Sequence, residues 1–188
     1  MMNPIVALDS QILQTLYAMR DPALVHALIY ITELGGTVVV GGISACVGLW
    51  LLAKKRIEYL AGLCVSVLGS AAVVFLLKAL VHRTRPPAFF QAYTETGASF
   101  PSAHAAVSLA LYGFLLYIIW RMPIRKEWQI AKTVAVFVLV AVIAFSRLYL
   151  GVHFFSDVIG GLAIGALFVW LGILTVKKCE QLLGTTSR

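Results

Sequence analysis

The sequence predicts an all-α fold, a polytopic transmembrane helical bundle, from its hydropathy, its low charge and its long apolar runs. The chain has 188 residues, 61% of them hydrophobic, and a mean hydropathy of +0.92. Only 12% are charged, about half the fraction usual in soluble domains. Long apolar runs cover residues 37–53, 57–77, 102–120, 133–146 and 158–176. Since a helix needs about 20 apolar residues to cross the hydrocarbon core, we expect five spans.

We expect one integral-membrane domain over residues 1–188. Its parts are interfacial or partly inserted helices over 1–36, core spans over 37–178 and an external loop over 83–101. A loop of this length in a compact domain is usually functional or disordered. Its aromatic residues suit contact with lipid and are Phe89, Phe90 and Tyr93.

The segment from residue 4 to residue 19 has the pattern of an amphipathic helix. Apolar side chains recur at helical spacing, at Ile5, Leu8, Ile12 and Leu16. Asp9 and two glutamines disfavour a full span. We therefore expect an N-terminal amphipathic helix that lies in the membrane interface.

A second N-terminal helix is predicted to begin after Asp21, which acts as N-cap with Pro22 at the first helical position. The segment 22–34 is short for a span, and Gly35-Gly36 either end this helix or bend it into the next. Whether it adds a sixth span is left open.

Basic residues are divided unevenly between the two ends of the spans. If the spans alternate in direction, ten of them share one side: Lys54, Lys55, Arg56, Arg121, Arg125, Lys126, Lys132, Lys177, Lys178 and Arg188. The positive-inside rule makes this side cytoplasmic. The net charge of +7 therefore reflects topology rather than a nucleic-acid partner. The remaining five are Arg20, Lys78, Arg83, Arg85 and Arg147, and four of them sit at external span ends, where a specific reason is needed.

The first external cluster is KALVHRTRP, which begins at Lys78. Lys78 and Arg85 are two helical turns apart, so they share a face if the helix persists that far. The residue before a proline disfavours the α region, so Arg85 is predicted to mark the helix end. Alone, the pair also fits a snorkelling lysine and a loop arginine.

The second cluster, SFPSAH, opens the third span. Pro101 suits a first helical turn, and Ser99 or Ser102 is a candidate cap. The free N–H groups and the dipole of such a helix start can bind an anion. His104 falls in this first turn, where a lone histidine also fits a polar interface residue.

The third cluster is SRLYLGVHFFSD, which holds Arg147, His153 and Asp157. A carboxylate four residues after a histidine can reach one ring nitrogen. That contact would fix the tautomer and leave the other nitrogen as nucleophile or base. The alternative is an interfacial ion pair that lowers the cost of placing Asp157 near lipid.

Together, the three clusters bring cations, histidines and a helix N-terminus to one membrane face. Arginine forks and helix N-termini both bind phosphate oxygens. Two histidines allow one to attack and the other to protonate the leaving oxygen. The cations would repel a metal ion, and the cysteines show no metal or disulfide spacing. A phosphoester or phosphoanhydride therefore fits best as the bound group.

The three segments match K-x6-R-P, P-S-G-H and S-R-x5-H-x3-D, with Ala103 in place of the glycine. In this signature and its order, the chain resembles the type 2 phosphatidic acid phosphatase superfamily. Its short length is similar to that of the bacterial integral-membrane lipid phosphatases, which include phosphatidylglycerophosphate and undecaprenyl-diphosphate phosphatases. Alanine at this position is acceptable if the residue is ordinary helix.

The resemblance implies a role for each matching residue. His153 would be the nucleophile that forms a phosphohistidine, Asp157 would orient it, and His104 would protonate the leaving lipid oxygen and then activate water. The phosphoryl oxygens would be held by Lys78, Arg85, Ser102, Ala103 and Arg147. No metal or other cofactor is implied. Arg83 and His82 have no assigned role, and snorkelling or contact with a lipid headgroup is favoured over catalysis for them.

The implied function is a lipid phosphatase of the bacterial plasma membrane, with its active site on the external, periplasmic face. The substrate is a phosphomonoester or diphosphate on a membrane lipid, and its identity is left open, as is the oligomeric state. A lipid phosphotransferase of the same superfamily is the alternative enzyme. An anion or lipid transporter is disfavoured because no polar residues continue through the spans to the cytoplasmic side.

Overall fold

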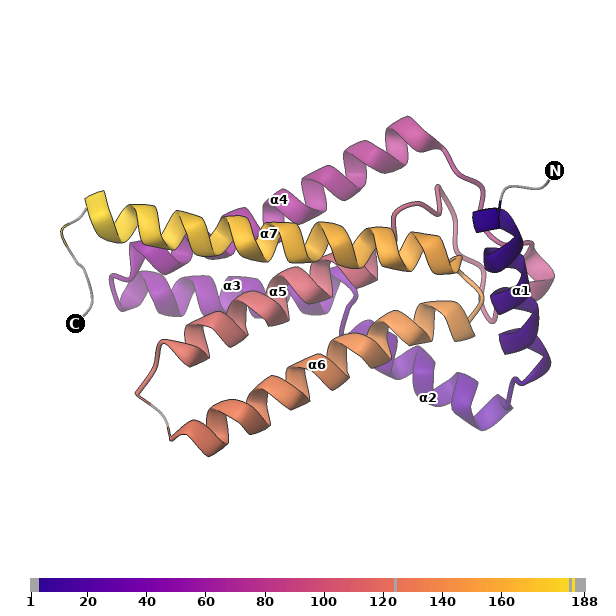
Figure 1. Ribbon diagram of the computed structural model, residues 1–188, viewed down its shortest axis with the longest axis horizontal. Helices are drawn as coiled ribbons and strands as arrows, with labels where there is room; N and C mark the ends of the chain where they lie inside the picture. Colours follow the sequence, from indigo (N-terminus) through magenta and orange to yellow (C-terminus); the bar gives the residue numbers. More distant parts are fainter. Residues whose placement is uncertain (1–3, 124, 183, 185–188) are drawn as a thin grey trace.

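The structure, a computed structural model, describes residues 4–123, 125–182 and 184 (Figure 1). Within these residues the chain forms helices and no strand, which confirms the predicted all-α class. The elements are α1 (Pro4–Ala18), α2 (Pro22–Glu33), α3 (Thr37–Ala53), α4 (Ile57–Val81), the 3-10 helix η1 (Ala88–Phe90), α5 (Ala103–Trp120), α6 (Lys126–Tyr149) and α7 (Phe155–Leu182).

Five helical segments are long and apolar enough to cross a membrane, as the sequence predicted. They are Pro22–Ala53, which joins α2 to α3, and then α4, α5, α6 and α7. With 12 residues, α2 alone is shorter than the about 20 that a spanning helix needs. In the described part of the chain no sixth segment reaches the length and hydropathy of a span.

Helices α4, α5 and α7 pack together along the length of the bundle (Figure 1). Where α4 crosses α7, Gly62 and Gly172 let the two backbones approach closely: a Cβ on Gly172 would lie 2.7 Å from the carbonyl oxygen of Gly62. The buried Phe114 and Val176 fill the space beside this crossing. Such close approach at small residues is a common way for spanning helices to associate.

Helices α5 and α7 also come close at the end that carries the sequence clusters. Gly161 of α7 lies against the carbonyl of Ser102, and a Cβ there would collide with it. The backbone N–H of Ser102 donates to the carbonyl oxygen of Asp157 at 3.0 Å. The second and third clusters are thus joined through the backbone.

Helix α1 lies across this same end of the bundle, roughly at right angles to the long helices (Figure 1). The turn that follows α1 is bound to the end of α6, because Arg20 Nε donates to the carbonyl of Tyr149 at 2.8 Å. The Tyr149 hydroxyl accepts from the backbone N–H of Asp21 at 2.8 Å. The Asp21 side chain caps α2 as predicted, by accepting from the N–H of Leu24 at 2.9 Å.

The predicted end of the fourth helix is wrong. The sequence placed it at Arg85, but α4 ends at Val81, with His82 in the left-handed conformation at φ 48°. Arg85 therefore does not continue the helical face of Lys78. It reaches the site from the loop instead, where the N–H of Ser99 donates to the carbonyl of Arg83 at 2.8 Å.

Candidate active site

The structure brings the predicted site residues to one end of the bundle. Lys78 lies in the last turn of α4 and Arg147 in the last turn of α6. Ser102 is the N-cap of α5, and Asp157 lies in the first turn of α7. The other residues of the set are Arg85 in the loop, Ala103 and His104 at the start of α5, and His153 in the turn between α6 and α7.

The imidazole of His153 is buried against Asp157. Its Nδ1 lies 3.5 Å from Oδ2 of that carboxylate, a contact longer than a good hydrogen bond. The same Oδ2 accepts from the backbone N–H of Phe154 at 2.9 Å, which fixes its position at the start of α7. Asp157 is therefore placed to orient the ring.

Burial lowers the pKa of His153 from 6.5 to about 4, and the positive charges of Arg147 and Arg85 act in the same direction. The neighbouring Asp157 carboxylate opposes this shift only in part. The ring is consequently neutral at neutral pH, as the predicted nucleophilic role requires.

Arg85 determines which ring nitrogen is available for attack. Its Nη1 donates to the carbonyl of Val152 at 2.9 Å and lies 3.3 Å from Nε2 of His153. A guanidinium can only donate, so the lone pair of Nε2 faces Arg85. The ring proton then sits on Nδ1, towards Asp157, and Nε2 is the unprotonated nitrogen that the predicted nucleophilic role requires.

A carboxylate of the external loop lies between two of the predicted phosphate ligands. Oε1 of Glu95 is 3.4 Å from Nη2 of Arg85, and Oε2 pairs with Nη2 of Arg147. Burial acts to raise the pKa of Glu95, but Arg147 and Arg85 outweigh it and hold the pKa below its usual value. A carboxylate held by two arginine forks has the contacts that a phosphoryl group would make.

Arg147 is fully buried, yet its hydrogen bonds are incomplete. Its Nη1 donates to Thr32 Oγ1 at 3.1 Å and to the Tyr93 hydroxyl at 2.5 Å. Among the described residues its Nε has no partner, and neither does the buried hydroxyl of Ser102. Buried polar groups are rarely left unpaired, so both atoms are candidates for contact with a ligand.

The start of α5 differs in detail from the prediction. Ser102 occupies the N-cap position, but its side chain makes no capping bond. The hydroxyl of Ser99 instead donates to the carbonyl of Thr84 at 3.1 Å. Ala103 is the first residue of an ordinary helix and has a negative φ, so it does not need the freedom of glycine.

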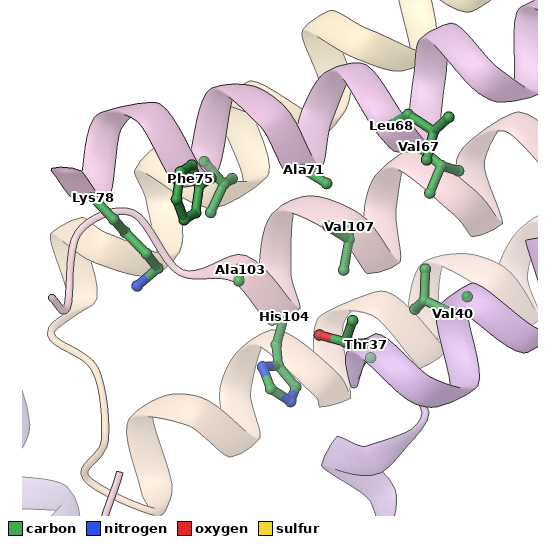
Figure 2. Close-up of a pocket in the computed structure, with 13 residues that line it drawn as sticks. Thr37, Val40, Val67, Leu68, Ala71, Phe75, Lys78, Ala103, His104 and Val107 are labelled. Atoms are coloured by element: carbon green, nitrogen blue, oxygen red, sulfur yellow. The ribbon is translucent and has the colours of Figure 1, made fainter. Parts of the chain in front are cut away.

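An apolar groove of about 450 Å³ leads to the site between α3, α4 and α5 (Figure 2). Its apolar walls include Val40, Val67 and Phe75. Figure 2 shows Lys78, Ala103 and His104 at one end of the groove. The Lys78 ammonium also donates to the carbonyl of Ala98.

Sequence reasoning missed three charged or polar residues that contact the site: Asp9, Arg83 and Glu95. Arg83 Nη1 lies 2.6 Å from Oδ1 of Asp157, and its Nη2 lies 2.7 Å from Oδ2 of Asp9. A carboxylate within the predicted amphipathic helix was the available signal, but Asp9 served only to disfavour a span. In the described residues no group of three or more His, Cys, Asp or Glu side chains is arranged to hold a metal ion.

Membrane-spanning helices that gather histidines, arginines and a helix N-terminus at one end are the arrangement expected of an integral-membrane phosphatase. The sequence profile of the PAP2 superfamily matches residues 59–181, and the chain belongs to this superfamily.

Individual relatives are phosphatases. Phosphatidylglycerophosphatase B of Bacillus subtilis (strain 168) is 26% identical over 171 residues, which cover 90% of this chain and 83% of that protein. Decaprenylphosphoryl-5-phosphoribose phosphatase of Mycobacterium tuberculosis (strain ATCC 25618 / H37Rv) is 36% identical over 127 residues, which cover 66% of this chain and 64% of that protein. The chain is therefore a multi-pass membrane phosphatase related to lipid phosphatases.

The fold is shared with a solved structure. The transmembrane PAP2-type phosphatidylglycerolphosphate phosphatase from Bacillus subtilis superposes with a TM-score of 0.85 at 24% identity, over 100% of this chain and 90% of that one. LpxE from Aquifex aeolicus superposes with a TM-score of 0.68 at 21% identity, over 89% and 93%.

Proposed function

We propose that this protein hydrolyses a phosphomonoester or diphosphate on a membrane lipid through a phosphohistidine on His153, without a metal. The observation that carries the proposal is the placement of His153. Its Nε2 lies 3.3 Å from Arg85, while its Nδ1 faces Asp157. Phosphatidylglycerol phosphate and undecaprenyl diphosphate are the first candidate substrates, followed by phosphatidic acid and diacylglycerol diphosphate.

In the first step Nε2 of His153 attacks the terminal phosphorus, and the bond from that phosphorus to the leaving oxygen breaks. The leaving oxygen is the ester oxygen of the lipid in a phosphomonoester and the bridging oxygen of the lipid phosphate in a diphosphate. His104 gives a proton to that leaving oxygen. The ring proton on Nδ1 stays beside Asp157, which stabilises the positive charge that forms on the imidazole. Arg85, Arg147 and the N–H groups at the start of α5 stabilise the equatorial oxygens in the transition state.

In the second step His104 takes a proton from water, and the water oxygen attacks the phosphoryl group. The bond from phosphorus to Nε2 breaks, which releases inorganic phosphate and restores neutral His153. The site can then accept another substrate.

The surroundings of the site suit a lipid substrate in the external leaflet of a bacterial plasma membrane. The apolar groove between α3, α4 and α5 has room for part of an acyl or prenyl chain, and it ends at Lys78 and His104. A headgroup phosphate that reaches Arg85 and Arg147 takes the place of Glu95, so the loop carboxylate moves aside when substrate binds. The basic residues predicted at the opposite ends of the spans support a site that faces outwards.

The direct test is phosphate release from the four candidate lipids by wild type and by His153→Ala. We expect the variant to lose essentially all activity, and Asp157→Asn to retain a small part of it. His82→Ala serves as the control because His82 is an exposed histidine near the same membrane face. If His153→Ala were as active as the wild type, the mechanism would be overturned. If the wild-type protein released phosphate from none of the four lipids, the proposed substrate class would be overturned.

A further inference from the structure

Asp9 is the one charged residue in the described part of α1. Its side chain is buried and points at the site. Asp9 is 2% exposed, although α1 lies on the surface of the bundle end. Its Oδ1 accepts from the backbone N–H of Ser156 at 2.9 Å, and its Oδ2 accepts from the Ser156 hydroxyl at 2.6 Å. Burying a carboxylate is costly, so such complete pairing marks a specific role.

Arg83 connects this carboxylate to Asp157. Its Nη2 pairs with Asp9 at 2.7 Å, and its Nη1 pairs with Oδ1 of Asp157 at 2.6 Å. The same Nη1 donates to the Ser156 hydroxyl at 2.6 Å. The guanidinium also lies over the ring of Phe154, 4.5 Å from its centroid. The planar fork is therefore held on three sides.

We propose that Asp9 and Arg83 are positioning residues that set the orientation and the effective charge of Asp157 towards His153. This inference rests on the proposed function, in which Asp157 orients the nucleophile. Arg83 occupies Oδ1 of the carboxylate, so only Oδ2 is left to face the imidazole. Asp9 in turn shares the positive charge of Arg83, so Asp157 keeps enough negative charge to stabilise the imidazolium.

The chain of contacts thus alternates in charge from α1 to the nucleophile. Each contact joins segments that are far apart in sequence: Asp9 and Arg83 are 74 residues apart, as are Arg83 and Asp157. An amphipathic helix on the membrane surface is consequently linked to the chemistry through one carboxylate. Correct seating of α1 becomes a condition for full turnover.

A plain structural role for the same contacts makes different predictions. If Asp9 and Arg83 only fasten α1 to the bundle, their loss lowers stability and leaves the kcat and pH profile of the folded fraction unchanged. If they act on Asp157, their loss lowers kcat with little change in KM, because substrate is held by other residues. The acidic limb of the pH profile then also shifts, because His153 must be neutral to attack.

The direction of the pH shift differs between the two residues. Removing the negative charge of Asp9 leaves the surroundings of His153 more positive, so the ring stays neutral to lower pH. Removing the positive charge of Arg83 has the opposite effect. Both variants leave the other charged or titratable groups around His153 and Asp157 unchanged. These groups are Lys78, Arg85, Glu95, His104 and Arg147.

The experiment measures kcat, KM and the pH profile of Asp9→Asn, Arg83→Met and the double variant, on purified full-length protein with phosphatidic acid in mixed micelles. We expect roughly a 10-fold loss of kcat in each single variant, within the about 100-fold that a misplacement of 1 Å can cost. The acidic limbs should move in opposite directions. In the double variant the limb should return towards that of wild type, because the two charges cancel.

Glu180→Gln is the matched control. Glu180 is also a buried carboxylate paired with an arginine, Arg121, at 2.6 Å, but at the other end of the bundle. It should lose stability without loss of kcat. Wild-type kcat and an unshifted pH profile in folded Asp9→Asn would overturn the positioning role. An active His153→Ala would instead overturn the proposed function, so the two failures are distinguishable.

Discussion

The two ends of the bundle both pair arginines with carboxylates, but they do so in different ways. At the end remote from the site, Arg121 donates to Glu180 and to the Tyr59 hydroxyl, and its side chain is 32% exposed. At the site end, Arg147 is fully buried and still has an unpaired Nε among the described residues. The remote end therefore holds a partly exposed arginine, whereas the site end buries an arginine that has an unused hydrogen-bond donor among the described residues.

This difference separates a topological charge from a functional one. Basic residues at the remote end follow the positive-inside rule and need no ligand. A buried guanidinium with unused donors has a desolvation cost that the protein alone does not fully offset. An anionic ligand would supply the missing partner. For a guanidinium, burial together with incomplete pairing therefore distinguishes the site end from the remote end.

The largest contrast is expected from replacing one arginine at each end with lysine. Arg147→Lys loses the fork that can hold two phosphoryl oxygens, so we expect kcat to fall by about 100-fold to 1,000-fold, as for loss of a transition-state donor. Arg121→Lys should leave kcat unchanged. Phosphate-release kinetics on both variants checks this, and equal losses would show that the ends do not differ as argued.

A smaller effect is expected from removing a buried hydroxyl. Ser102 and Ser70 are both buried, and neither hydroxyl has a partner among the described residues. Ser102→Ala should lower kcat/KM by roughly 10-fold, about the worth of one hydrogen bond to a charged group. Ser70→Ala, in the middle of α4, should have no kinetic effect. The melting temperatures of the two variants should be alike, and a matching loss of activity in both would contradict a phosphate contact at Ser102.

Replacing the loop carboxylate Glu95 should strengthen substrate binding, whereas the two substitutions above weaken activity. Glu95→Gln weakens the group that occupies Arg85 and Arg147, so substrate should bind with a KM a few-fold lower. Inorganic phosphate should inhibit at a lower concentration for the same reason. Inhibition constants for wild type and variant measure this effect. A raised KM would show that Glu95 helps to bind substrate rather than competing with it.

The smallest expected effect is on stability. The pKa of His153 is about 4 in the folded protein, below the 6.5 of an exposed histidine. Between these values the unfolded chain binds the proton first, so stability is present above pH 6.5 and falls as pH drops towards 4. The slope contributed by this group is at most about 1.4 kcal/mol per pH unit.

Denaturation in detergent at a series of pH values measures this slope. His153→Asn should flatten the fall in stability, whereas His82→Asn, which removes an exposed histidine, should not. The same slope in wild type and both variants would show that His153 does not titrate in the way described.

Most of the fold, and the gathering of the candidate site residues at one end of the bundle, could be predicted because their signals are local. Each span is a continuous apolar run, and each cluster lies at the end of one. The spacing of His153 and Asp157 also depends only on neighbours in sequence. So does the start of α5, for which the sequence left Ser99 and Ser102 open and the structure has Ser102. Such features are determined by helix periodicity and capping, which the sequence displays directly.

Other features could not be predicted because they depend on tertiary contacts. Asp9 pairs with a residue 74 positions away, and Glu95 with one 52 positions away. The end of α4 was misplaced because His82 adopts a left-handed conformation that no local signal required. The hydroxyl of Ser102, which has no partner among the described residues, likewise depends on which groups pack around it.

The central claim is that Nε2 of His153 carries the phosphoryl group during turnover, and a trapped intermediate tests it most directly. The protein would be mixed with a lipid labelled in its terminal phosphate, quenched under alkaline conditions and digested for mass spectrometry. We predict an acid-labile, alkali-stable phosphoryl group on the peptide that contains His153, and its absence in His153→Ala. Turnover at the wild-type rate with no labelled histidine, or with the label on another residue, would contradict the account.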